Sequence, residues 1–131
     1  MADFIAFNEG RVEVATNGLP AQCHFLLSTK AVSDLRAADT LASVGEIKGS
    51  GYQRLERRRP EPTGSNPTVL SFETVIWSTG VNVGWPDAVR SCVMATPSGK
   101  AVCAWNLVGG GARDMSEAST TEQFTPTLTV A

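Results

Sequence analysis

Glycine and proline interrupt this chain along its whole length, and that punctuation limits what the chain can fold into. The 131 residues include 12 glycines and 7 prolines, and the runs between them are short and rich in Val, Ile, Thr and Phe. Such runs favour strands, and no window of helical length shows a sustained apolar repeat. We therefore predict an all-β protein, an antiparallel β-sandwich or barrel of about seven short strands with flexible polar arms.

The length of the chain suits one packed core. A chain of 131 residues that is 42% hydrophobic and 18% charged buries a single core more readily than two. Residues 1–108 are predicted to form the β-sandwich domain. Residues 109–131 are predicted to form a flexible polar segment that ends in a closing strand of the same domain, within "FTPTLTV".

The first predicted hairpin depends on Asn17 and Gly18. These residues suit the two positive φ angles of a type I′ turn, so 11–16 and 21–28 are expected to pair as strands. A short helical turn is expected afterwards, at 35–38.

The middle of the chain is expected to continue as strands. One strand is predicted through Tyr52 and Leu55, and the turn-rich sequence "RPEPTGSNP" is an exposed connection. The run "TVLSFETVIW" then alternates as a single strand. Its core-facing side chains are predicted to be Leu70, Phe72, Thr74 and Ile76.

A second hairpin is predicted over 91–107, "SCVMATPSGKAVCAWNL". Pro97 and Gly99 favour a type I turn closed by a left-handed glycine bulge. This three-residue loop pairs Thr96 with Lys100.

The register of this hairpin decides the relation between two of the three cysteines. The three-residue loop pairs Val93 with Cys103 and Cys92 with Ala104, which places the two thiols on opposite faces of the sheet. A two-residue loop would instead set Cys92 directly opposite Cys103. We predict the first register and no disulfide between this pair.

Charge and hydropathy exclude several classes of partner. A net charge of -2 and a pI near 5.3 argue against a nucleic-acid binder, which needs a basic excess. No stretch approaches the roughly 20 apolar residues of a membrane span. The N-terminal sequence "MADFIAFNEG" lacks the basic start and apolar run of a secretory signal, so synthesis in a cytoplasm is expected.

Catalytic and metal-binding patterns are not found in the sequence. His24 adjoins Cys23 in a predicted strand, where successive side chains point to opposite faces, so the two form neither a nucleophile–base pair nor a shared zinc site. The glycine-rich stretches "GSGYQR" and "GGGAR" lack the complete phosphate-binding motifs. We expect no enzyme activity, no metal and no cofactor.

One cluster of charge has two interpretations. Arg54, Arg57, Arg58 and Arg59 fall within six positions, and on an extended chain the side chain of Arg58 points away from those of Arg57 and Arg59. The cluster is either a solvated strand end that discourages edge pairing, or a contact to an acidic protein surface.

The three tryptophans are expected in two different environments. Trp77 and Trp105 lie in predicted strands and are expected in the core. Trp85 precedes Pro86 in a predicted loop and is the best candidate for an exposed side chain, which would contact a partner or stack on a sugar.

Two elements of the sequence resemble a group of small structural proteins from tailed bacteriophages. The first has the form Glu-(Ile/Val)-x-Gly-x-Gly-Tyr-x-Arg, and the second is a tryptophan-containing loop followed by a strand, a turn with glycine and another strand. The matching residues of the first are Glu46, Gly49, Gly51, Tyr52 and Arg54. Those of the second are Trp85, Val89, Gly99, Val102, Trp105 and Leu107.

The resemblance implies a virion component made in the bacterial cytoplasm. The leading expectation is a capsid decoration or stabilising subunit that binds the major capsid protein and forms a homo-oligomer, first of all a trimer. The alternatives are a tail, collar or fibre-associated subunit, and a carbohydrate-binding module that recognises the host surface.

Overall fold

The computed structural model describes residues 4–65, 67–107 and 112–130, which form nine strands and two short helices. All strand pairs are antiparallel, which confirms the all-β class, although the sheets do not close into a barrel. In chain order the elements are β1 (Phe4–Ala6), α1 (Asn8–Asn17), β2 (Gln22–Ser28), the 3-10 helix η1 (Val32–Asp34), β3 (Leu55–Arg58), β4 (Thr68–Ser71), β5 (Val75–Ser78), β6 (Ser91–Ala95), β7 (Ala101–Asn106), β8 (Thr121–Phe124) and β9 (Thr127–Val130).

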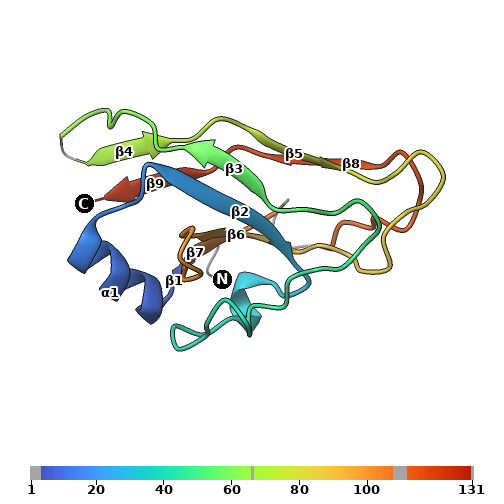
Figure 1. Cartoon of the computed structure of the whole chain (residues 1–131), viewed down its shortest axis with the longest axis horizontal. Coiled ribbons are helices and arrows are strands. Elements are labelled where there is room, and N and C mark those ends of the chain that lie inside the picture. Colours follow the sequence, from blue (N-terminus) through green and yellow to red (C-terminus); the bar gives the residue numbers. More distant parts are fainter. Residues whose placement is uncertain (1–3, 66, 108–111, 131) are drawn as a thin grey trace.

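Two layers make up the fold (Figure 1). One is a five-stranded sheet in the order β1-β7-β6-β2-β3. The other is a long two-stranded ribbon, in which β4 pairs with β9 and β5 with β8. The two ladders of the ribbon join where the amide of Phe72 donates to the carbonyl of Pro126 at 2.9 Å.

The main core lies between the sheet and the ribbon. Phe25 of β2 meets Phe72 of the ribbon edge-on, with ring centroids 5.2 Å apart. The indole of Trp105 in β7 donates to the carbonyl of Thr127 in β9 at 3.0 Å. A second cluster, on the opposite face of the sheet, contains Phe7 and residues of the 31–44 segment. The five-stranded sheet is therefore buried on both faces, whereas the ribbon has one face in solvent.

The predicted hairpin over 11–28 is wrong in its first half. Residues 11–16 belong to α1, and Gly18, with a φ of 77°, ends that helix by donating its amide to the carbonyl of Val14 at 2.8 Å. The left-handed glycine was expected from the sequence, but it closes a helix rather than a hairpin. The second half, β2, is confirmed.

Tertiary contacts hold α1 in place, since its own surface is polar and only Gly10 is buried. Gly10 lies on β7 so closely that a Cβ would stand 2.3 Å from the carbonyl oxygen of Ala101. The carboxylate of Glu9 accepts hydrogen bonds from the amides of Ala101, at 2.7 Å, and Leu41, at 2.9 Å. These contacts overcome the strand preference of the "RVEVAT" alternation.

The run "TVLSFETVIW" is two strands, not one. Phe72 is buried as predicted, but the chain bends after it, and Val75 and Trp77 become the buried residues of β5 while Ile76 is 50% exposed. A slip of one residue exchanges the two faces of a strand, so the predicted core set fails beyond the bend. The partner "FTPTLTV" is divided too, because β8 ends at Phe124 and β9 starts at Thr127.

Other predicted boundaries shift by a few residues. The helical turn expected at 35–38 is η1, at Val32–Asp34, and the strand expected through Tyr52 starts only at Leu55. In the predicted polar segment 109–131, residues 112–130 contribute β8 and β9 to the ribbon. Residues 109–111 and 131 lie outside the described residues, and so does the flexible arm expected there.

The hairpin β6–β7 has the predicted turn but another register. Thr96 pairs with Lys100 through a 2.9 Å hydrogen bond, and Gly99 has a φ of 94°. A bulge between Met94 and Ala95 then shifts the pairing by one residue.

This bulge alters the placement of the cysteines. Val93 lies opposite Ala104 and Cys92 opposite Trp105, so Cys92 and Cys103 share the face that looks into the main core. The expectation of opposite faces is wrong. The prediction that the two thiols are not bonded is confirmed, because both are free, as is Cys23.

Candidate functional site

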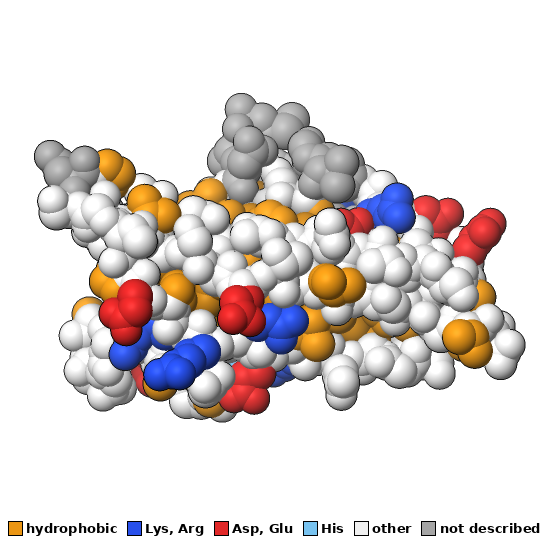
Figure 2. Space-filling model, turned by 90° about the horizontal axis from the view of Figure 1, so that it is seen from above, with side chains coloured by type: hydrophobic (Ala, Val, Ile, Leu, Met, Phe, Trp, Pro, Cys, Tyr) orange, Lys and Arg blue, Asp and Glu red, His pale blue; other side chains and the backbone are white. Residues whose placement is uncertain are grey.

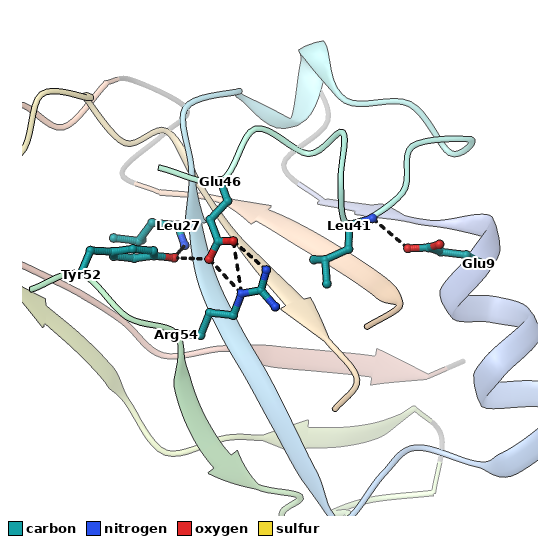
Figure 3. Close-up of polar contacts among 6 residues, drawn as sticks. All are labelled: Glu9, Leu27, Leu41, Glu46, Tyr52 and Arg54. Carbon is teal, nitrogen blue, oxygen red and sulfur yellow. Dashed lines mark hydrogen bonds and ion pairs between the residues drawn. The ribbon is translucent and has the colours of Figure 1, made fainter. Parts of the chain in front are cut away.

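The segment 46–54, which carries the phage-like motif, is organised around the carboxylate of Glu46 (Figure 3). Arg54 donates to it from Nε at 2.9 Å and from Nη2 at 2.7 Å, and the Tyr52 hydroxyl donates at 2.8 Å. The same hydroxyl accepts a hydrogen bond from the amide of Leu27 in β2 at 3.1 Å. This network fastens the segment to the five-stranded sheet.

Burial and the neighbouring hydrogen-bond donors have opposite effects on the pKa of Glu46. Burial raises the pKa of its carboxyl, but the hydrogen bonds from Arg54 and Tyr52 outweigh burial, so the pKa lies below its usual value. Burial and the adjacent Glu46 charge raise the pKa of Tyr52. The network is therefore a carboxylate, a neutral phenol and a guanidinium, all engaged with one another.

The two glycines of the motif are required for different structural reasons. A Cβ on Gly49 would stand 2.2 Å from the ring of Trp85, so only glycine fits there. Gly51 has a φ of 77°, in the region that favours glycine, and open space around it. Both allow the segment to bend around the Trp85 ring.

Trp85 is buried, with 2% of its surface exposed, so the expectation that it contacts a partner or a sugar is wrong. Its indole donates to the carbonyl of Ser50 at 2.9 Å, and its ring meets Tyr52 edge-on at 5.5 Å. Trp77 and Trp105 are buried as predicted, at 3% and 9% exposed. None of the three offers a flat exposed ring on which a sugar could stack.

The predicted arginine cluster lies beside a groove on the surface, which we call the arginine groove. Its larger lobe has a volume of about 460 Å³ and its smaller lobe about 340 Å³, and both contain Arg58 and Arg59. The larger lobe is lined by Ala21, Arg58, Arg59, Pro60, Glu61, Pro62, Thr68 and Leu70. Figure 2 shows basic and acidic side chains gathered with exposed hydrophobic ones on the left half of this face.

The arginines of the cluster differ in what they contact. Arg54 binds Glu46, and Arg57 is half-buried and donates to the carbonyl of Thr74 at 3.2 and 3.3 Å. Arg59 donates to the carbonyl of Leu19. The exposed guanidinium of Arg58 has no hydrogen-bond or ion-pair partner among the described residues.

The sequence pattern and the structure differ in which arginine side chains lie on the same side of the chain. An extended chain would set Arg57 and Arg59 on one side, but β3 ends at Arg58, and Arg59 turns into the groove beside it. Arg57 therefore stabilises the fold through its hydrogen bonds to Thr74. Arg58 and Arg59 line the part of the surface that is accessible to a partner.

A second groove, the helix groove, was missed in the sequence because α1 was read as a strand. It has a volume of about 360 Å³ and runs between α1, β1, β7 and the ribbon. Its lining is almost wholly apolar and includes Val14, Leu19, Val102 and Leu128. Leu70 lines both grooves, so the two adjoin. The sequence feature that could have revealed the helix is Gly18, because a glycine commonly follows the last residue of a helix.

The remaining chemistry-bearing residues do not form a site. Nε2 of His24 lies 3.9 Å from the carboxylate of Glu56 on the sheet surface, facing away from Cys23 as predicted, and lines neither groove. Burial raises the pKa of Cys23 to about 11, against a smaller opposite effect of Arg59, and burial also raises the pKa of Cys92 and Cys103. Within residues 4–65, 67–107 and 112–130, no three His, Cys, Asp or Glu side chains are arranged to hold a metal ion.

The fold defines an all-β sandwich that carries an arginine groove and an adjoining apolar groove on its surface. No family model matches the chain, and no curated protein or solved structure matches it significantly. No helix in the described part of the chain has the length and apolar character to span a bilayer.

Proposed function

We propose that this protein is a non-enzymatic structural subunit of a tailed-bacteriophage particle, which binds a neighbouring virion protein through the arginine groove. Its place is the capsid surface, as a decoration or stabilising subunit on the major capsid protein. Assembly takes place in the bacterial cytoplasm, without nucleic acid, membrane, metal or cofactor as partner.

The observation that carries the proposal is the pair Arg58 and Arg59 in the groove. Arg58 is exposed and uncommitted, and Arg59 is held by the carbonyl of Leu19. A planar guanidinium binds a carboxylate in bidentate geometry, and arginine is enriched at protein interfaces. The apolar residues Pro60, Pro62 and Leu70 provide area for burial beside the charges.

The motif residues support the structural class in another way. Glu46, Gly49, Gly51, Tyr52 and Arg54, which carry the resemblance, all act on the packing of one loop against β2 and Trp85. A motif with a scaffold role agrees with a family defined by architecture rather than by catalysis.

The test is the number of copies in purified virions of the phage that encodes the chain. A decoration subunit is expected at about one copy per major capsid protein, or about one third if trimers occupy threefold positions. A few copies per particle would replace the capsid assignment with the tail, collar or fibre alternative. Absence from the particle would refute the proposal altogether.

The groove is tested by Arg58→Glu, with Arg36→Glu as the matched control on the 31–44 segment. Both side chains are exposed, so both variants should fold. We expect Arg58→Glu to lower incorporation into the particle at least tenfold, since a charge reversal at a docking surface adds repulsion. Equal incorporation of the two variants would exclude the groove.

The host-surface carbohydrate-binding alternative loses its main support, because it depended on an exposed Trp85. Binding of a glycan array by the wild-type protein would restore it.

A further inference from the structure

β9 lies beside β4 at one end of the ribbon (Figure 1), and its outer edge pairs with no other strand of the described residues. In an antiparallel pair, residues that bond to the neighbouring strand alternate with residues whose amide and carbonyl point away from it. The amide of Phe72 donates to the carbonyl of Pro126, so Leu128, two residues further, also bonds to β4. The amides and carbonyls of Thr127 and Thr129 therefore point to the outer edge.

Two sets of hydrogen bonds agree with this alternation. The indole of Trp105, which lies beside β9 and not in the ribbon, donates to the carbonyl of Thr127 at 3.0 Å. On the other strand, Val69 pairs with Thr129 and exchanges bonds of 2.8 and 2.9 Å with Thr63, on the side away from β9. Apart from the bond with Trp105, the outward amides and carbonyls of Thr127 and Thr129 have no partner in the described part of the chain.

Both edges of the five-stranded sheet have features that discourage the addition of a further strand. β3, at one edge, carries the charged run Glu56, Arg57 and Arg58. β1, at the other edge, has only three residues and is followed directly by α1. Charged side chains and very short strands are two means by which natural sheets prevent pairing at their edges.

The other three strands of the ribbon each have a group bound at or beside the outer edge. Thr63 bonds to β4, as described above. The guanidinium of Arg57 binds the carbonyl of Thr74 just before β5, and that of Arg113 binds the carbonyl of Thr121 in β8 at 3.2 Å. β9 has the sequence "TLTV", with no charge and no proline. It is therefore the strand whose edge is best suited to accept another strand.

An uncharged hollow adjoins the outer edge of β9, and we call it the edge hollow. It has a volume of about 330 Å³ and is lined by Phe4, Trp105, Thr127 and Thr129. The ring of Phe4 lies 5.8 Å from that of Trp105, and the Phe4 side chain is 41% exposed. Phe4 also lines the helix groove, so the apolar surface continues from one hollow into the other. A strand added to β9 would cover apolar surface as well as bond the free backbone groups.

We infer that the outer edge of β9 pairs antiparallel with the same edge of a second copy, so that the chain forms a two-fold dimer. Thr127 of each copy lies opposite Thr129 of the other, and each of these pairs exchanges two backbone hydrogen bonds. The carbonyl of Thr127 keeps its bond from Trp105, because a carbonyl oxygen has two lone pairs. The exposed threonine side chains also form cross-strand pairs.

A second copy fits this edge because the contact is self-complementary. A two-fold axis uses the same surface on both subunits, and every outward amide of β9 then meets an outward carbonyl. The edge hollow and the strand carry no charge, so the two identical surfaces do not repel each other. The axis is perpendicular to the combined sheet, which places the edge hollows of both copies on the same face. Phe4 of each copy is then covered together with the edge.

The experiment is sedimentation velocity of the full chain over a wide range of concentration and salt. The wild type should form a dimer as its concentration rises, and nothing larger. The dimer should be insensitive to salt, because the contact contains no charged side chain. A wild type that stays monomeric at every concentration, a trimer such as the phage resemblance suggests, or dissociation by salt would each overturn the inference.

Thr129→Pro removes an outward amide of β9 and leaves the bonds to β4 intact, since proline is tolerated where the amide of an edge strand faces solvent. The dissociation constant of the dimer should rise at least tenfold. Gln123→Pro is the matched control in β8. Thr79 donates to the carbonyl of Thr120, so the same alternation directs the amide of Gln123 outward. The control should dimerise like the wild type, and equal dissociation constants for the two variants would contradict pairing through β9.

Two double variants test the register and leave every backbone amide in place. Thr127→Lys with Thr129→Lys sets like charges opposite each other across the two-fold axis, and this variant should be monomeric. Thr127→Lys with Thr129→Glu sets opposite charges at the same positions and should dimerise. Both positions are exposed, so both variants should fold, and they differ in one side chain only. The same oligomeric state for both would overturn the proposed pairing.

The outcomes separate this inference from the proposed function. The arginine groove shares no residue with the edge hollow, so Arg58→Glu should dimerise like the wild type. Loss of the dimer in Arg58→Glu would overturn the inference. If the chain is monomeric but present in virions, only the inference fails. If it dimerises through β9 but is absent from virions, the inference stands and the proposed function fails.

Discussion

The indole ring of Trp85 lies directly against the backbone of Gly49, where a Cβ would stand 2.2 Å from the ring atom Cδ1. The contact is supported by the hydrogen bond from the indole to the carbonyl of Ser50. It explains why a tryptophan in a loop is buried: the preceding glycine-rich segment wraps around it.

Gly49→Ala should therefore destabilise the protein by about 1–3 kcal/mol, because the added methyl group overpacks a filled site. Urea unfolding followed by tryptophan fluorescence measures the change. Gly80→Ala is the control, since its Cβ would meet only ordinary contacts, the nearest at 3.5 Å, and should change stability by less than about 0.5 kcal/mol. Equal midpoints for the two variants would contradict the described packing.

Glu46→Gln should lower the free energy of unfolding by about 1–2 kcal/mol at neutral pH, because it removes the charge that Arg54 and Tyr52 bind. The pKa of Glu46 is lowered in the folded state, so its contribution is fully present above its unfolded pKa of about 4.3. The contribution is lost as the pH falls through the lowered folded pKa.

Urea titrations at a series of pH values check this prediction. The difference between wild type and Glu46→Gln should be constant above about pH 5 and should shrink toward zero in acid. Glu61→Gln is the control, since its exposed carboxylate has no hydrogen-bond or ion-pair partner in the described part of the chain. A difference that persists unchanged in acid would show that the charge of Glu46 is not the stabilising feature.

Gly10→Ala should release α1 from the sheet while the sandwich stays folded. The helix has a polar surface and only Gly10 buried, so its position depends on the close approach to β7 and on Glu9. Amide hydrogen exchange should show faster exchange across 8–17 with little change in β2 and β6. Val12→Ala, at an exposed position of the same helix, should leave exchange unchanged. Uniform loss of protection over the whole chain would contradict a separately held helix.

The three thiols should be unreactive in the native protein. Cys23, Cys92 and Cys103 are buried, and burial raises the pKa of each, which removes the reactive thiolate. A thiol reagent such as DTNB should label none of them without denaturant and all of them with it. Reduction should leave the intact mass unchanged. A gain of two hydrogens mapped to Cys92 and Cys103 would contradict the free thiols.

Local chemistry was enough to predict several parts of this fold. Glycine and proline punctuation with β-rich runs predicted the class, and Pro97 with Gly99 predicted the turn between β6 and β7. The burial of Trp105 followed from its place in a strand, whereas Trp77 is buried on the face that the alternation of its strand had assigned to solvent. Each of these depends on a few neighbouring residues, so no distant contact was needed.

Errors arose where a distant contact outweighed the local pattern. Residues 11–16 alternate like a strand, but Glu9 and Gly10 attach them to β7 as a helix. The bend after Phe72 reverses the buried face, and the bulge after Met94 does the same for Cys92. A single-residue shift is small in sequence but exchanges the two faces of a strand.

The candidate site, too, was predictable from the sequence only in its local features. The sequence by itself determined that this is an all-β chain with a cluster of arginines and a Glu46–Arg54 motif, since composition and spacing are local properties. Only the tertiary structure decided that Trp85 is buried, that Arg57 supports the fold, and that Arg58 and Arg59 line one groove. Those facts depend on which segments the sheet and ribbon bring together, and packing between residues far apart in the chain settles that.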